Sequence, residues 1–232
     1  MPLGYRVYTR VERPDPDLVR ALATHATPDL ADAMNRANTL DPAIRSIFGP
    51  IPRVAGPAVT VAIPTGALSV LKEAVERTAP GDVLVVNACG NPTAAVIGGN
   101  ICRGMVHRGV AGLVVDGALR DVSEIRADGL PSFARHVATF AGPKDGPGEV
   151  NVPVACGGVV VNPGDIVVAD EDGIVVVPPE RAAEVLERVA RVEAGFAAAQ
   201  EVLLRGGVTG IADIEAAMRA EGCEFVDGAW PR

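Results

Sequence analysis

The sequence predicts a single α/β domain with a mixed sheet and with helical extensions before and after it. Its 232 residues are 48% hydrophobic and 22% charged, a composition that can bury a substantial core. The apolar residues are mainly Val, Ala, Leu and Ile, while Phe, Tyr and Trp number only 5, 2 and 1, which suits closely packed strands covered by helices. Helical patterns alternate with strand patterns early in the chain, whereas strand follows strand later, and this favours a mixed sheet over a uniform doubly wound one.

The chain is expected to begin with helices and then to alternate between strands and helices. Residues 14–37 are typical of one helix or two short ones, with Thr27 as an N-cap and Pro28 in the turn that follows it. Residues 54–63 form an apolar run typical of a strand, and residues 66–77 carry apolar side chains at helical spacing.

The tripeptide PGD occurs twice, each time just before a predicted strand. Pro80-Gly81 suits the centre of a type II turn, because Pro fixes the first φ angle and Gly accepts the positive second one. The strand Val83–Val86 follows this turn, and the sequence NPGDIVV at residues 162–168 repeats the pattern. We interpret the repeat as shared turn chemistry rather than as a domain duplication.

The middle of the chain is expected to hold three strands and two helices, with Gly98-Gly99 as a break. The predicted elements are a strand at 94–97, a helix at 100–108, a strand at 110–116, a helix at 121–128 and a strand at 133–140.

The C-terminal part is expected to contain a loop, several short strands and a long helix. Residues 142–151 are rich enough in Gly and Pro to predict a loop, and residues 152–177 alternate strands with turns. Pro178-Pro179 then opens a helix that should reach Leu204, roughly 25 residues and therefore longer than a compact domain usually needs. We expect this helix to contact a second copy of the chain, so we predict an oligomer.

Composition excludes several classes of function. The net charge is −8 and the sequence has no basic stripe, so we expect no nucleic-acid partner. The four cysteines, Cys89, Cys102, Cys156 and Cys223, form no CxxC pair, which argues against a zinc site. The polar N-terminus is unlike a secretory leader, and no apolar stretch reaches the roughly 18 to 20 residues of a membrane span. These features together predict a cytoplasmic protein with no membrane association.

Three charged residues follow the predicted strand at 110–116: Arg120, Asp121 and Glu124. One interpretation is a capping box, in which Asp121 caps the next helix and Glu124 reaches back to it. The other is a ligand site, because α/β folds bind ligands beyond the carboxyl ends of their strands and Arg grips carboxylates in a bidentate manner. These residues alone leave both interpretations open.

The segment Gly98-Gly99-Asn100-Ile101 provides a second candidate site at the start of the predicted helix. Paired glycines there expose backbone N–H groups, and the helix dipole favours an anion. The alternative is a plain turn in which Gly is needed for a positive φ angle. The two candidate loops follow strands that should be neighbours, so they should open on the same edge. Amides and Arg120 would then hold an anion, while Asp121 and Glu124 would hold a hard cation, Mg²⁺ or Mn²⁺.

The order of several motifs resembles the RraA-like family. The matching stretches are TPDLADAMNR, VAGPAVTV, PGDVLVV, AAVIGGN and RGVAGLVVDGALRDVSEI, and the resemblance covers roughly residues 25–205 of a single domain spanning 1–232. It implies a mixed-strand α/β sandwich resembling swivelling phosphohistidine domains, with a long C-terminal helix. It also implies a homotrimer or hexamer with sites between subunits.

The resemblance implies a class II pyruvate aldolase that needs a divalent metal and acts on a small 2-keto acid, such as 4-hydroxy-4-methyl-2-oxoglutarate or 4-carboxy-4-hydroxy-2-oxoadipate, with oxaloacetate decarboxylation as a related reaction. In such a site Arg120 and Asp121 would be catalytic: Arg120 would bind the substrate's carboxylate and keto oxygen, and Asp121 would hold Mg²⁺ or Mn²⁺. Glu124 would act on the metal through water. The Gly98-Gly99 turn would present the amides of Asn100 and Ile101 to the carboxylate.

One departure from the family pattern bears on activity. Gly99 stands where the aldolases carry an Asp that would orient water at the metal. Two other functions therefore stay open: a non-catalytic regulator that binds an RNA-processing enzyme, and a related lyase or hydratase on another 2-keto or hydroxy acid. The only lysines are Lys72 and Lys144, and neither is well placed in the sequence for a Schiff base.

Overall fold

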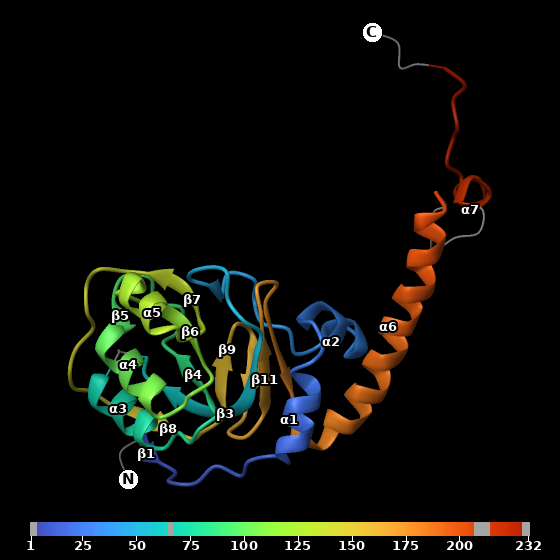
Figure 1. Ribbon diagram of the computed structural model, residues 1–232. Coiled ribbons are helices and arrows are strands. Elements are labelled where there is room, and N and C mark those ends of the chain that lie inside the picture. Colours follow the sequence, from blue (N-terminus) through green and yellow to red (C-terminus); the bar gives the residue numbers. More distant parts are fainter. Residues whose placement is uncertain (1–3, 65–66, 207–213, 229–232) are drawn as a thin grey trace. The chain divides into compact units, whose positions relative to one another are not determined.

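Parallel strands carry the apolar runs of the sequence at the centre of the structure, a computed structural model that describes residues 4–64, 67–206 and 214–228 (Figure 1). The strands are β1 (Tyr5–Val7), β2 (Arg45–Ser46), β3 (Val54–Ala62), β4 (Val83–Asn87), β5 (Ala95–Ile97), β6 (Gly112–Leu119), β7 (Ser132–Val137), β8 (Gly148–Val150), β9 (Val154–Cys156), β10 (Val159–Val161), β11 (Ile166–Ala169) and β12 (Ile174–Val177). The main sheet has the order β1-β8-β3-β4-β6-β7-β2.

The main sheet is mixed, as predicted. Strands β3, β4, β6 and β7 run parallel to one another. In contrast, β11 and β8 pair antiparallel with β3, and β2 pairs antiparallel with β7. The early part of the chain therefore supplies parallel strands with helical crossovers, and the late part adds hairpins.

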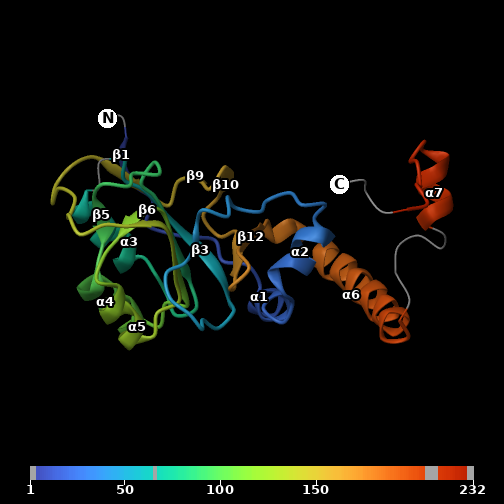
Figure 2. The same ribbon diagram turned by 90° about the horizontal axis from the view of Figure 1, so that it is seen from above.

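Helices cover one face of the parallel strands (Figure 1, Figure 2). They are α3 (Leu68–Glu76), α4 (Gly99–His107) and α5 (Val122–Asp128), while α1 (Pro16–Leu22) contacts β3 and α2 (Thr27–Ala33) contacts β12. The two-helix alternative for residues 14–37 is thus the correct one. The predicted N-cap role of Thr27 is wrong, because Ala26 precedes the helix and the Asp170 carboxylate accepts from the Thr27 N–H at 3.0 Å.

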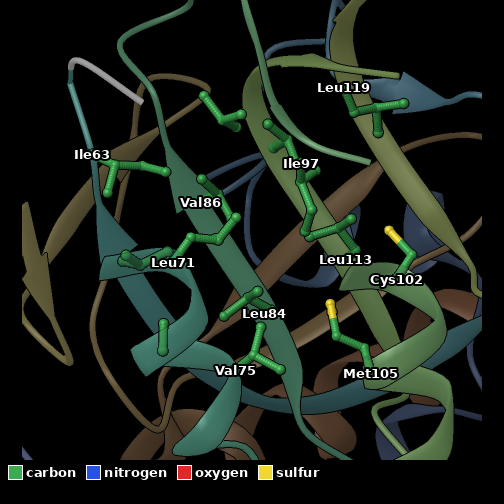
Figure 3. Close-up of a cluster of buried hydrophobic side chains, with 14 of the residues drawn as sticks. Ile63, Leu71, Val75, Leu84, Val86, Ile97, Cys102, Met105, Leu113 and Leu119 are labelled. Carbon is green, nitrogen blue, oxygen red and sulfur yellow. The ribbon is translucent and has the colours of Figure 1, made fainter. Parts of the chain in front are cut away.

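The core lies on both faces of the parallel strands. Leu84 and Val86 of β4 face the helices, where Leu71 and Met105 pack over them (Figure 3). Val83 and its alternate neighbour Val85 point to the opposite face, against the late hairpins. Because successive side chains of a strand point to opposite faces, burial on both sides requires a continuous apolar run, which is what β4 has.

The predicted PGD turn is present in both places. Gly81 has φ +88°, and the Asp82 N–H donates to the Ala79 carbonyl at 3.1 Å, as a type II turn requires. The Asp82 carboxylate also accepts from the Ala79 N–H at 2.7 Å. Residues 162–165 repeat both hydrogen bonds, so the two tripeptides share one turn design.

Two predicted boundaries need correction. The loop predicted at 142–151 ends at residue 147, because β8 pairs with β1 and β3. A Cβ at Gly148 would lie 2.7 Å from the Ala62 carbonyl oxygen, so this glycine serves close backbone approach within the sheet rather than a loop. Strand β6 continues to Leu119, beyond the predicted end at Asp116, and it therefore delivers the chain directly to Arg120.

The predicted C-terminal helix is present as α6 (Ala182–Leu204), after a 3-10 turn at Pro179–Arg181. The chain divides into two units, residues 1–189 and 190–232, and the start of α6 belongs to the first, in which Val185 and Val189 are buried. The second unit also contains α7 (Ile214–Ala220). Its Phe196 is 54% exposed, and the expected oligomer stays a prediction. Over the described ranges, no helix combines the length and apolar character needed to cross a bilayer.

Candidate functional site

The two candidate loops lie side by side at the carboxyl ends of β5 and β6. These strands pair in parallel, with Ile97 opposite Leu119, and the Arg120 N–H donates to the Ile97 carbonyl at 3.1 Å. The Gly98-Gly99 turn and the Arg120-Asp121 turn therefore open at the same edge of the sheet. The juxtaposition that the sequence predicts is confirmed.

The capping-box interpretation of Asp121 is wrong. Asp121 precedes α5 with φ +62° and ψ +38°, and its side chain makes no capping hydrogen bond to that helix. Its Oδ2 instead accepts from the Gly99 N–H at 3.1 Å, at the start of α4. The left-handed backbone turns the carboxylate away from its own helix, and a non-glycine residue held in this conformation is often found at functional sites.

Glycine is needed at positions 98 and 99 because a side chain would not fit there, and not because of the backbone angle. Gly98 has φ −147°, so the alternative of a positive φ angle is wrong. A Cβ at Gly98 would lie 2.5 Å from Asp121 Oδ2, and a Cβ at Gly99 would lie 2.6 Å from Glu124 Oε2. Two carboxylates from α5 and the turn before it therefore converge on adjacent backbone positions. Any side chain at these positions would displace one of them.

Arg120 is loosely held and remains accessible. Its side chain is 44% exposed, and its Nε lies 3.6 Å from Asp121 Oδ2, beyond ordinary hydrogen-bond distance. Glu124 pairs at 3.5 Å with Arg103, which makes a closer ion pair with Asp128 at 3.1 Å. Both the guanidinium and the two carboxylates at the turn can thus reorganise around a ligand.

Beneath the turn, the Cys102 thiol reports the local electrostatic environment. Burial, and to a smaller extent the negative charges of Asp121 and Asp128, raise its pKa to about 12. The same negative potential that stabilises the protonated thiol would stabilise a cation at the turn.

A cavity of about 150 Å³ lies beside Arg120 and Asp121. Gly98 and Ile101 also line it, whereas Gly99 and Asn100 do not. The Ile101 N–H donates to the Gly98 carbonyl at 3.1 Å within the first turn of α4, which leaves the Asn100 N–H as the expected amide without a helical carbonyl partner.

Lys72 also lines this cavity, together with Leu68 on the same face of α3. Sequence reasoning did not bring Lys72 to this cavity, and the expectation that neither lysine forms a Schiff base stays a prediction. The spacing of four residues between Leu68 and Lys72 could have indicated a shared helix face, but the sequence has no signal that brings α3 to the end of β6. A second, more open cavity of about 470 Å³ lies on the other side of Arg120 and Asp121, along residues 137–139.

Asp121 and Glu124 are the groups that fit a divalent cation. Within the described ranges there is no group of three or more His, Cys, Asp or Glu side chains that could hold a metal. Mg²⁺ commonly uses one or two carboxylates and fills its other positions with water and substrate oxygens. Two converging carboxylates at an exposed turn suit that pattern and do not suit a closed structural metal site.

This chain matches a known protein family and is similar to a named protein. Residues 27–176 match the family described as "RraA-like: Aldolase/RraA". A Thermus thermophilus protein named 4-hydroxy-4-methyl-2-oxoglutarate aldolase is 36% identical over 153 residues, which cover 66% of this chain and 92% of the relative.

Solved structures with the same fold carry a second description. Streptomyces coelicolor RraAS2, described as an unusual member of the RNase ES inhibitor RraA family, aligns with a TM-score of 0.72 at 32% identity, covering 82% of this chain and 99% of that one. The RNA-processing inhibitor RraA from Thermus aligns with a TM-score of 0.61 at 34% identity, covering 66% and 93%. The similar proteins thus include one named as an aldolase, one described as an inhibitor and one described as an unusual member of the inhibitor family.

Proposed function

The chain belongs to the Aldolase/RraA family, and from this premise we propose that it is a class II pyruvate aldolase that depends on a divalent metal. Its substrate would be a 4-hydroxy-2-keto dicarboxylic or tricarboxylic acid, cleaved to give pyruvate, with oxaloacetate decarboxylation as a side activity. The observation that carries the proposal is the convergence of Asp121 and Glu124 on the Gly98-Gly99 turn, beside Arg120 and a small cavity.

We assign the cation to Asp121, with Glu124 acting through water. When bound, Mg²⁺ or Mn²⁺ would supply Lewis acidity to the keto group of the substrate. Asp121 is suited to this task because its left-handed backbone already directs the carboxylate out of α5 and toward the start of α4. Because the protein would supply few ligands to the cation, positions would remain for oxygens of a 2-keto acid.

Arg120 would bind the carboxylate of the substrate and face the keto oxygen, where negative charge develops as the carbon–carbon bond breaks. A donor preorganised at such a position stabilises the transition state more than the ground state. The loose pairing of Arg120 with Asp121 supports this role, because the guanidinium needs little rearrangement to take a second anion. The Asn100 N–H at the start of α4 would supply a further donor to the same carboxylate.

We propose that Glu124 compensates for the missing aspartate at position 99. Its Oε2 lies 2.6 Å from where a Cβ of residue 99 would stand, so it occupies the start of the space that an Asp side chain would use. A carboxylate there can orient water for proton transfer to and from the substrate, which is the role the family resemblance gives to the aspartate.

We further propose a homotrimer or hexamer in which a neighbouring subunit completes the site. Phe140 is 72% exposed and Val137 is 59% exposed, and Val137 borders the open cavity next to Arg120. Large apolar side chains exposed beside a polar site are typical of surfaces that bind another protein.

A second function, inhibition of an RNA-processing enzyme by direct binding, is favoured by the descriptions of the two structural relatives. An inhibitor of this kind requires an exposed surface but no metal and no substrate cavity. Divalent-metal binding at Asp121 therefore separates the two functions. A related lyase or hydratase acting on another 2-keto or hydroxy acid would retain the same metal site.

The experiment is to follow pyruvate after adding oxaloacetate or 4-hydroxy-4-methyl-2-oxoglutarate with Mg²⁺ or Mn²⁺. We expect pyruvate from the native protein, no pyruvate above background after chelation, and a large loss with Asp121→Ala. Equal rates for the native protein and Asp121→Ala would contradict the proposal for these substrates.

A further inference from the structure

Lys72 is a charged group at the cavity that the assigned roles do not use. It lines the same cavity of about 150 Å³ as Arg120 and Asp121. The rest of the wall is largely apolar, with Leu68, Val96 and other aliphatic residues contributing. Lys72 and Arg120 are therefore the two cationic side chains of this wall, and both are available to a bound anion.

The charge of Lys72 is not neutralised by the helix that carries it. Glu73 is held by Arg77, and Glu76, four residues after Lys72, pairs with Arg108 at 3.2 Å. Among the residues that the structure describes, no carboxylate forms an ion pair with Lys72. The two acids of α3 are therefore paired with arginines rather than with Lys72.

The position of Lys72 is fixed by the packing of α3. Leu71 and Val75 are buried in the core beneath this helix, while Leu68, which packs partly against the same core, and Lys72 lie on the flank of the helix that borders the cavity. The segment that follows Phe140 closes over the start of the helix, because the Ser69 N–H donates to the Lys144 carbonyl at 3.0 Å. Lys144 itself contributes no side chain to the cavity wall.

From this arrangement we infer that Lys72 selects substrates that carry a second carboxylate. Resting on the proposed function, the inference is that Arg120 takes the carboxylate next to the keto group and Lys72 takes the distal one. The substrate class is then a small 2-keto acid with at least two negative charges. A monoanion of the same length would lack the partner for Lys72 and would bind more weakly.

Lys72 is exposed to solvent and keeps the four-carbon flexibility of its side chain. Schiff-base lysines, in contrast, are activated by desolvation in an apolar pocket or by another cation. The environment of Lys72 therefore suits a carboxylate-binding group that discriminates between substrates rather than a nucleophile.

Two unreactive 2-keto acids of equal chain length test the inference: 2-oxoglutarate, which has a distal carboxylate, and 2-oxopentanoate, which has a methyl group instead. Binding is measured by calorimetry to the full chain in the presence of Mn²⁺. We expect the native protein to prefer 2-oxoglutarate by about five- to tenfold, the range expected for one partly exposed charge pair. Lys72→Met should abolish the preference and leave 2-oxopentanoate unchanged within about twofold, whereas Lys72→Arg should retain it.

Lys144→Met is the matched control, because it removes the other lysine without touching the cavity wall. An unchanged preference in Lys72→Met, or an equal loss in Lys144→Met, would overturn the assignment of Lys72 while leaving the proposed function intact. Failure of the native protein to bind either acid would instead contradict the proposed function itself.

Discussion

Strand β6 and its end contain two Asp–Arg pairs whose environments differ sharply. Asp116 lies within the strand, and its carboxylate accepts from Arg135 Nε and from the Gly157 N–H, both at 2.7 Å. Asp121 lies just beyond the strand, 36% exposed, with Arg120 at 3.6 Å. Both carboxylate oxygens of Asp116 thus have a partner, and the pair joins β6 to β7 and the β9-β10 hairpin. In the second pair, hydrogen-bonding groups of Arg120 and Asp121 remain available for a ligand.

These two environments distinguish structural charged residues from functional ones in this protein. Arg135 also pairs with Asp41 at 2.7 Å, and its hydrogen bonds to Asp116 and Asp41 raise its pKa. A largely buried pair whose two carboxylate oxygens already accept hydrogen bonds cannot take a cation without losing those partners. The pair at Arg120 can bind an anion and a cation with little loss, so it is the pair to which we assign chemistry.

The largest expected effect is on catalysis. Arg120→Lys keeps the positive charge but removes the bidentate fork, and we expect kcat/KM for pyruvate formation to fall about 100-fold or more. Stability should change by less than about 0.5 kcal/mol, because the side chain is 44% exposed. Arg126→Lys, on α5 and outside both cavities, is the control and should retain activity. Similar activity in Arg120→Lys and Arg126→Lys would remove Arg120 from the site.

The next effect is on stability and belongs to the other pair. Asp116→Asn leaves Arg135 and the Gly157 amide with a poorer partner, so we expect the free energy of unfolding in urea to fall by about 2–3 kcal/mol. The same replacement at Asp121 should cost less than about 1 kcal/mol, because that side chain has water as an alternative partner. If both variants lost equal stability, the contrast between the two pairs would be wrong.

Variants at positions 99 and 124 test whether Glu124 takes the role of the missing aspartate. Glu124→Ala should weaken Mn²⁺ binding about tenfold, the usual cost of losing an outer partner of a metal site. Gly99→Asp alone should bring no gain, because its Cβ would meet Glu124 at 2.6 Å. Combined with Glu124→Ala, Gly99→Asp loses its contacts with the Glu124 carboxylate and keeps a 3.0 Å contact with the Cβ of residue 124, which a small shift relieves, so the affinity should recover. If the double variant bound Mn²⁺ as weakly as Glu124→Ala does, the proposal that Glu124 takes the role of the missing aspartate would be wrong.

The smallest effect concerns two buried thiols, one near each pair. Burial raises the pKa of Cys102 and of Cys156 to about 12, with added effects of Asp121 and Asp116 respectively. At pH 8, below both raised values, each thiol stays protonated and iodoacetamide should modify only the exposed Cys89 and Cys223.

Asp116→Asn should then speed modification of Cys156 by at least about tenfold through local opening, and leave Cys102 unchanged. Mass spectrometry of the labelled peptides measures both rates. An equal increase in the modification rates of Cys102 and Cys156 would indicate global unfolding. The two Asp–Arg pairs would then not differ in local stability.

The sequence allowed the site at Arg120 and Asp121 to be anticipated, but not its geometry and not the pairing of Asp116 with Arg135. Apolar periodicity was enough to place α4, β6 and α5, and neighbouring strand ends implied that Gly98 and Arg120 would meet. It could not indicate that Asp121 adopts a left-handed backbone, because Asp at an N-cap is equally compatible with ordinary capping. The cavity role of Lys72 also depends on tertiary packing, since α3 and β6 are far apart in the chain.

We propose that Asp121, and not Asp116, holds a divalent cation beside Arg120. Mn²⁺ binding, followed by the loss of the free-ion electron paramagnetic resonance signal, tests it most directly in the native protein, Asp121→Asn and Asp116→Asn. We predict binding in the native protein, at least about tenfold weaker binding in Asp121→Asn, and native affinity in the folded fraction of Asp116→Asn. Equal Mn²⁺ affinity in the native protein and Asp121→Asn would contradict the claim.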